Sequence, residues 1–203
     1  MVEHALLPLL NAHGFKKRAS TWYRSEGDVL QVFNIQPSRW NDDEKEEFTI
    51  NVGAVSRFAW ETCWGKNLPK NVAIEECCPA FRIGEILNDF APQASDKWWC
   101  LTSDLSDAAI DRIQEQVVQV TREKCLPLLD ELRTESDLLR AFERLQEASR
   151  SQPANRLCYA ILLALNGSKS EAEEELLAFE HPKLEAWHRR AVTVKTRLGL
   201  GVA

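Results

Sequence analysis

Two neighbouring stretches that alternate like β-strands, yet carry many polar side chains, constrain the fold of this chain more than any other feature. They are VLQVFNIQPSRW, from Val29 to Trp40, and EFTINVGAVSRF, from Glu47 to Phe58. Successive side chains of a strand point to opposite faces of its sheet. Amide and hydroxyl groups here take positions that are apolar in a buried strand: Asn34, Gln36 and Ser38 in the first stretch, Thr49 and Asn51 in the second. We therefore predict a sheet with one polar face.

The charge balance argues against one class of partner. The 203 residues carry a formal net charge of -6. A general nucleic-acid binder needs a basic surface to neutralise phosphates. We therefore expect no nucleic-acid partner, and a protein partner that is neutral or basic.

The N-terminal segment, MVEHALLPLL, has an acidic third residue and no small-residue cleavage site, so it does not resemble a signal peptide. No stretch approaches the roughly 18 consecutive apolar residues of a membrane span. The six cysteines of such a chain are expected to be reduced and mostly buried as small hydrophobic residues. These features predict a cytoplasmic protein, of bacterial type, without a membrane contact.

The distribution of aromatic residues suggests two parts. Strand-like segments rich in turn residues precede Cys100, and helical periodicity follows it. We predict an α+β fold with an N-terminal helix over residues 2–12, an antiparallel sheet of about four or five strands, a long helix from Ser106 packed on that sheet, and a C-terminal helical hairpin or bundle. The predicted domains are residues 1–133, the α+β domain, and residues 134–203, the helical appendage.

Several local patterns refine this arrangement. FRIGEIL and DKWWCLTSD are expected to be short strands separated by a loop at Pro92, and Pro127 is expected to restart the long helix rather than continue it. Thr134, with Asp137 three residues later, predicts a helix cap. LCYAILLALNG and SEAEEELLAFE resemble a single tetratricopeptide-type hairpin, although repeat solenoids need about three such units.

Catalytic motifs are missing from the sequence. It contains no GxxxxGK[ST], GxGxxG, GxSxG or HExxH pattern, and no CxxC pair for zinc. We therefore expect no catalytic residues, no bound metal and no cofactor. A redox role for the vicinal pair Cys77 and Cys78 is disfavoured, because the first hundred residues offer no obvious histidine base.

One constellation of residues is a candidate site. If the amides of the two opening stretches share a face, oriented polar groups lie among arginines and flat aromatic walls, as in ligand clefts and protein interfaces. The alternative is that the amides satisfy backbone groups and the tryptophans form the core. The candidate binding residues are Asn34, Gln36, Ser38, Arg39, Trp40, Asn51, Arg57, Arg82, Trp22 and Trp98.

Three strings, GFKKRASTWYR, DVLQVFNIQPSRW and FTINVGAV, together resemble a bacterial family catalogued as domain of unknown function (DUF) 4304. The later family elements correspond to Cys77 or Cys78, to Arg82 in FRIG, and to Trp98 or Trp99. Pro37 departs from the family pattern, where a lysine is common. The resemblance covers roughly residues 1–130 and implies a compact α+β domain, without an activity to transfer.

Three functions are compatible with these features. The leading hypothesis is a non-enzymatic binding protein, such as an immunity or antitoxin-type inhibitor that occludes a toxin through the aromatic-rich polar face. The first alternative is an enzyme or a receptor for a phosphate or carboxylate ligand that uses Asn34, Gln36, Asn51 and Arg82. The second is a scaffold that holds a peptide in the C-terminal helices. The sequence leaves the oligomeric state open.

Overall fold

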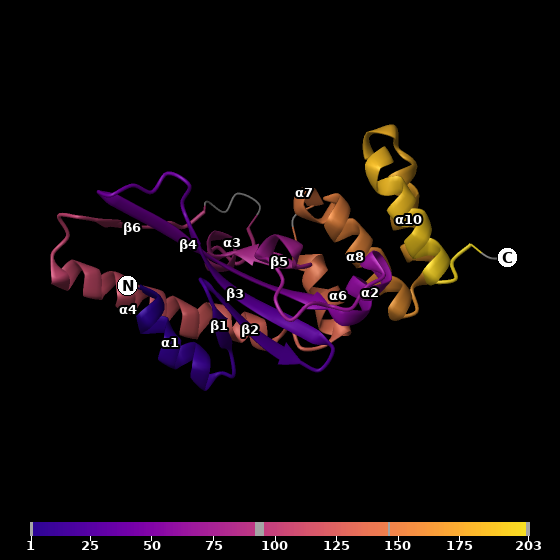
Figure 1. Ribbon diagram of the computed structural model, residues 1–203. Helices are drawn as coiled ribbons and strands as arrows, with labels where there is room; N and C mark the ends of the chain where they lie inside the picture. Colours follow the sequence, from indigo (N-terminus) through magenta and orange to yellow (C-terminus); the bar gives the residue numbers. More distant parts are fainter. Residues whose placement is uncertain (1, 92–95, 146, 202–203) are drawn as a thin grey trace.

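The computed structural model describes residues 2–91, 96–145 and 147–201 of the chain (Figure 1). Within these residues a single antiparallel sheet of six strands forms the centre of the fold. Strands β1 to β5 follow one another in chain order, and β6 pairs with β4 beside β5. Their bounds are β1 Lys16–Arg18, β2 Thr21–Glu26, β3 Val29–Pro37, β4 Lys45–Ser56, β5 Ala80–Arg82 and β6 Trp99–Thr102.

The two faces of the sheet differ in what covers them. On one face, which we call the helix face, Phe33 lies opposite Val52, and both belong to the main hydrophobic core. On the other, which we call the open face, Asn34 lies opposite Asn51. The alternation in the sequence therefore correctly placed Asn34 and Asn51 on one face, but that face is polar only in part, because it also carries Leu30, Val32 and Val55, which are buried in a second hydrophobic cluster.

Figure 1 shows α1 and α4 along one side of this sheet and the later helices gathered at one end of it. The bounds of the α-helices are α1 Val2–Ala12, α2 Arg57–Trp64, α3 Ile83–Leu87, α4 Asp107–Val120, α5 Leu126–Asp130, α6 Glu135–Arg144, α7 Glu147–Arg150, α8 Pro153–Leu165, α9 Lys169–Leu177 and α10 Glu185–Arg197. The shorter turns are η1 Ile74–Glu76, η2 Thr121–Cys125, η3 Ala178–Glu180 and η4 Pro182–Leu184. This architecture confirms the predicted α+β fold, with a long helix on the sheet and helices α8 and α9 as the C-terminal hairpin.

Two local predictions were wrong. FRIGEIL is a strand only as far as Arg82, because the Glu85 carboxylate accepts the Arg82 backbone N–H at 2.7 Å and caps helix α3 instead. Pro127 does not restart the long helix, since the π-helical turn η2 carries α4 directly into α5. Such a turn changes the hydrogen-bond ladder locally, which is where a proline without an N–H is tolerated. The predicted loop at Pro92 lies outside the described residues.

The cap predicted before α6 is confirmed. Thr134 Oγ1 accepts the Asp137 backbone N–H at 3.2 Å, and the Asp137 carboxylate accepts the Thr134 N–H at 2.8 Å. Together these bonds satisfy donors that a helix start leaves free.

A buried polar cluster joins the helix face to the end of α5. Gln31 is fully buried, and its Nε2 donates to the carbonyls of Leu129 at 2.5 Å and Leu132 at 2.7 Å. Its Oε1 accepts from Arg24 Nε at 2.6 Å, and Arg24 Nη2 donates to Asp130 Oδ1 at 2.7 Å. Carbonyls at a helix end have no partner within the helix. Gln31 therefore adds a side-chain donor to the Leu129 carbonyl at the end of α5 and to the Leu132 carbonyl just beyond it.

The hydrophobic core is continuous from the sheet into the C-terminal helices. One cluster of buried residues contains Phe33 and Ile50 from the sheet together with Phe142 and Ile161 from α6 and α8. The predicted boundary between two domains at residues 133 and 134 thus stays a prediction.

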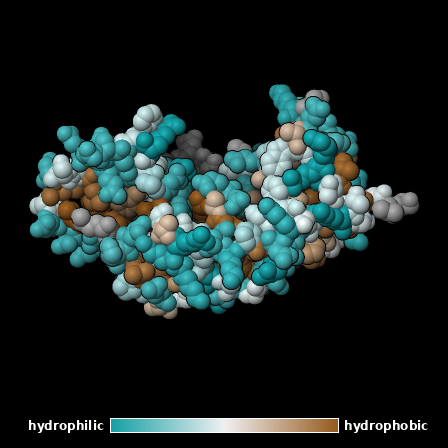
Figure 2. Space-filling view, in the orientation of Figure 1, coloured by the Kyte–Doolittle hydropathy of each residue, from teal (hydrophilic) through white to brown (hydrophobic). Residues whose placement is uncertain are grey.

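Figure 2 shows apolar side chains, in brown, gathered in a hollow at the end of the molecule that carries β6 and α4. None of the helices in the described ranges is long and apolar enough to span a membrane.

We predict that Gln31→Leu lowers the free energy of unfolding by about 3 kcal/mol, because the carbonyls of Leu129 and Leu132 and the Nε of Arg24 each lose a buried hydrogen bond. Urea denaturation followed by circular dichroism measures this. Gln116→Leu, at an exposed position of α4, is the matched control and should change stability by less than about 0.5 kcal/mol. Equal effects of the two substitutions would contradict this role of Gln31.

The Asp130 carboxylate should make stability depend on pH. Partial burial raises its pKa, but hydrogen bonds from Arg133 and Arg24 outweigh that effect, so its pKa lies below the ordinary value of 3.8. A lowered folded-state pKa means that the carboxylate stabilises the fold above the unfolded-state pKa, and that this contribution is lost as pH falls through the folded-state pKa. Asp130→Asn should therefore be less stable than the wild type at neutral pH, and the difference should shrink in acid. A difference that stays constant from neutral pH into acid would refute the prediction.

Candidate cleft between the open face and the C-terminal helices

Four neutral polar side chains form a ladder across β2, β3 and β4 on the open face. Asn51, which is only 4% exposed, donates through Nδ2 to Gln36 Oε1 at 2.9 Å and to Asn34 Oδ1 at 3.4 Å. Asn34 in turn donates to Thr21 Oγ1 at 2.9 Å. These side-chain amides therefore make most of their hydrogen bonds with one another. Within the described part of the chain, Gln36 Nε2 and Asn51 Oδ1 make no hydrogen bond, so one donor and one acceptor are free for a ligand.

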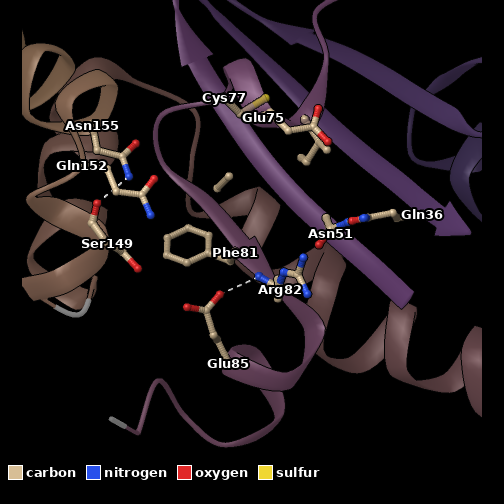
Figure 3. Close-up of a pocket in the computed structure, with 12 residues that line it drawn as sticks. Gln36, Asn51, Glu75, Cys77, Phe81, Arg82, Glu85, Ser149, Gln152 and Asn155 are labelled. Carbon is tan, nitrogen blue, oxygen red and sulfur yellow. Dashed lines mark hydrogen bonds between the residues drawn. The ribbon is translucent and has the colours of Figure 1, made fainter. Parts of the chain in front are cut away.

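The ladder ends at a cleft of about 330 Å³ between the sheet and the corner of α7 and α8. Gln36 and Asn51 line it from the sheet, and Gln152 and Asn155 line it from the helix side. Figure 3 shows these two pairs of amides on opposite sides of the Phe81 ring. The sequence folds this way because Pro153 opens α8 at its first position, where a missing N–H costs nothing.

The charged groups of the cleft give it a negative balance. Glu75 and Glu85 line it together with a single arginine, Arg82. The Arg82 guanidinium is already paired with the Asp96 carboxylate. An arginine with its own carboxylate partner is a weaker anion site than a free one, because an incoming anion must compete with that partner.

A segment spanning residues 65–79, which we call the crossing segment, covers the middle of the open face. Its Val72, Ile74 and Cys77 pack on Val32 and Val55 of the sheet as a second, smaller hydrophobic cluster. Tyr23 Oη donates to the Val72 carbonyl at 3.1 Å and holds the segment from the sheet side. The open face is therefore accessible only on either side of this segment.

Three of the predicted site residues lie at the turn between β3 and β4, outside the cleft. The Ser38 backbone N–H donates to the Glu47 carbonyl at 2.8 Å, and Ser38 Oγ accepts the backbone N–H of Trp40 at 3.2 Å. Trp40 is 73% exposed, with the Arg39 guanidinium 4.8 Å from its ring centre. This pair presents an aromatic and a cationic group at the surface.

The remaining three predicted residues are not part of the cleft. Trp22 is fully buried on the helix face, edge-on to Phe33 at 5.8 Å, so its assignment to the open face was wrong. Trp98 is half-buried just before β6 and does not line the cleft. Arg57 begins α2, 3.5 Å from Asp28, and lines a different depression across the crossing segment.

Five polar residues of the cleft were missed by sequence reasoning: Glu75, Glu85, Ser149, Gln152 and Asn155. The three from α7 and α8 reach the sheet only through the packing of the C-terminal helices. No short-range pattern in the sequence reports that packing. Asn155 also donates to the Ser149 carbonyl at 2.8 Å, which holds the corner of α7 and α8 together.

Four of the six cysteines, Cys77, Cys78, Cys125 and Cys158, are buried, and Cys63 and Cys100 are partly buried. Desolvation raises the pKa of Cys77, which lines the cleft, well above the ordinary thiol value, and raises that of Cys63 to about 11. Thiols with such pKa values are protonated at neutral pH and are poor nucleophiles. In the described ranges, no three His, Cys, Asp or Glu side chains are grouped so that they could hold a metal ion.

Comparison with known proteins identifies the family of the chain. Residues 6–131, more than half of the sequence, match the profile of the family described as domain of unknown function (DUF4304). Neither a curated protein nor a solved structure matches the chain. The matched region ends before α6, so it contains the sheet side of the cleft and not Gln152 or Asn155. The chain therefore belongs to the DUF4304 family.

Proposed function

We propose that this protein is a non-enzymatic binding protein that holds a segment of a protein partner in the cleft between the open face and α7 and α8. The observation that carries the proposal is the convergence of amides from both walls, Gln36 and Asn51 on one and Gln152 and Asn155 on the other. A cytoplasmic location in a bacterium belongs to the same proposal.

Side-chain amides suit a peptide, because each can both donate and accept a hydrogen bond, as a peptide group does. The free Gln36 nitrogen and Asn51 oxygen offer one of each at the sheet wall. The cleft volume of about 330 Å³ is near the lower end of small-molecule sites, which span roughly 300–1,000 Å³. It accommodates a short stretch of chain, and the rest of an interface would have to lie on the surrounding surface.

The charges favour a basic group in that segment. Glu75 and Glu85 face the cleft, while Arg82 is paired with Asp96. A lysine or arginine of the partner would complement the two glutamates. The same arrangement disfavours the alternative function, a receptor for a phosphate or carboxylate that uses Arg82 together with Asn34, Gln36 and Asn51.

Trp40 and Arg39 supply a second contact for the same partner. Tryptophan and arginine are over-represented among residues that dominate interface energies, and a stable interface needs about 800 Å² per partner. An inhibitor of the immunity or antitoxin type is the specific form of this proposal, because occluding a toxin requires a broad contact surface rather than catalytic groups.

The first prediction from this proposal concerns partner capture. Gln152→Arg places a bulky cation in the cleft at an exposed position, and it should weaken the complex at least about tenfold through like-charge repulsion and steric overlap. Gln116→Arg on α4 adds the same charge elsewhere and should leave affinity unchanged. Affinity purification from the source cells identifies the partner. Titration calorimetry with the purified partner then measures the affinity of both variants.

Two results would count against this proposal. One is a partner whose affinity is the same for the wild type and both variants, since the cleft would then not be the contact. The other is a monomer that retains no partner under several growth conditions.

The second prediction concerns small anions. Inorganic phosphate and nucleotides should not raise the melting temperature through the cleft, so any rise should be equal in the wild type and in Arg82→Ala, because the Arg82 guanidinium is occupied by Asp96 and two further carboxylates lie in the cleft. Differential scanning fluorimetry tests this directly. Stabilisation by an anion that disappears in Arg82→Ala would instead support the receptor hypothesis.

A further inference from the structure

On the other side of the crossing segment, the open face holds a second and larger depression, which we call the basic groove. Its volume is about 1040 Å³. Strand β1, the start of α2 and the crossing segment contribute its walls, with Tyr23 and Leu68 as apolar surface between them. Lys16 lies directly opposite Tyr23 in the sheet, so their side chains share the open face.

The groove is strongly basic in a chain whose net charge is -6. Five cationic residues line it, Lys16, Lys17, Arg18, Arg57 and Lys70, against one acidic residue, Glu61. Three of the five are uncompensated: within the described ranges Lys16, Arg18 and Lys70 form no ion pair, whereas Lys17 pairs with Glu3 at 2.6 Å and Arg57 lies 3.5 Å from Asp28. Concentrating like charges without partners costs stability, and an acidic ligand would relieve that repulsion.

The cations are spread along the groove rather than aimed at one point. Lys16 and Arg18 come from β1, and Lys70 comes from the opposite wall. A compact anion would contact only part of such a set. An extended chain with several carboxylates, and with apolar side chains for Tyr23 and Leu68, would contact all of it.

Nucleic acid fits the groove less well than an acidic peptide does. Binding to a phosphate backbone requires an unbroken basic track, since each phosphate is neutralised in turn. Glu61 lies within the groove, and Asp28 lies 3.5 Å from Arg57 of its lining. Isolated carboxylates of this kind interrupt a phosphate track but leave room for the spaced carboxylates of a peptide.

We infer that the basic groove is a second binding surface, which takes an extended acidic segment of a protein partner. The inference does not depend on the cleft at α7 and α8, because the two depressions are lined by separate sets of residues. Lys16, Arg18 and Lys70 contact the carboxylates of the segment, and Tyr23 and Leu68 pack against its apolar side chains.

The experiment uses the full chain and a fluorescein-labelled peptide of alternating glutamate and leucine, followed by fluorescence anisotropy. The variant is Lys16→Glu with Arg18→Glu, both at exposed positions. The matched control is Lys169→Glu with Lys183→Glu, also at exposed positions, which changes the net charge equally. We expect the groove variant to bind the peptide at least about tenfold more weakly than the wild type, the control to bind like the wild type, and wild-type affinity to fall with added salt.

Circular dichroism and the melting temperature identify any variant that fails to fold, and Lys70→Glu then serves as an independent groove variant that leaves the sheet unchanged. A peptide in which glutamine replaces glutamate should not bind. The inference is overturned if the wild type does not bind the acidic peptide, if both double variants lose affinity equally, or if a single-stranded oligonucleotide binds more tightly than the peptide.

Discussion

A buried amide, that of Gln31, determines where the helices meet the sheet. It donates to the Leu129 carbonyl of α5 and to that of Leu132 beyond it, while Arg24 and Asp130 complete the cluster. Two residues after Leu132, Thr134 caps α6, which leads into α7 and α8. Contacts on the helix face thus set the position of the helices that follow α5. These helices carry the cleft wall with Gln152 and Asn155, which lies on the open face. An unpaired amide at this depth would cost more than a paired one contributes, so the cluster also selects one arrangement of the layers.

The crossing segment divides the open face into two surfaces, the cleft and the basic groove. Gly53 allows this segment to pack closely on the sheet. A Cβ at Gly53 would lie 2.7 Å from the Cβ of Cys77, which is closer than side chains approach. The glycine in FTINVGAV, part of the family pattern, therefore has a packing reason. Without that close approach, Val72 and Ile74 could not cover the centre of the sheet, and the cleft and the basic groove would merge.

Local patterns predicted the parts of the site that depend on alternation. Asn34, Gln36 and Asn51 share a face because a strand has a period of two, and the sequence shows that period directly. Alternation within one strand does not say which face meets the helices. Trp22 was therefore placed on the wrong face, since only its pairing with Phe33 decides the matter.

The helix side of the cleft could not be predicted for a different reason. Gln152 and Asn155 reach the sheet through contacts between elements far apart in the chain. The net charge cannot locate charged surfaces either, because it is a sum over the whole chain. The neutral or basic partner that it suggested stays a prediction, which the glutamates of the cleft suit, and a sum does not report the cations that the fold collects in the basic groove. A partner that spans the crossing segment must present basic groups on one side and acidic groups on the other. Complementarity of that kind fixes the orientation of a partner more than it adds to affinity.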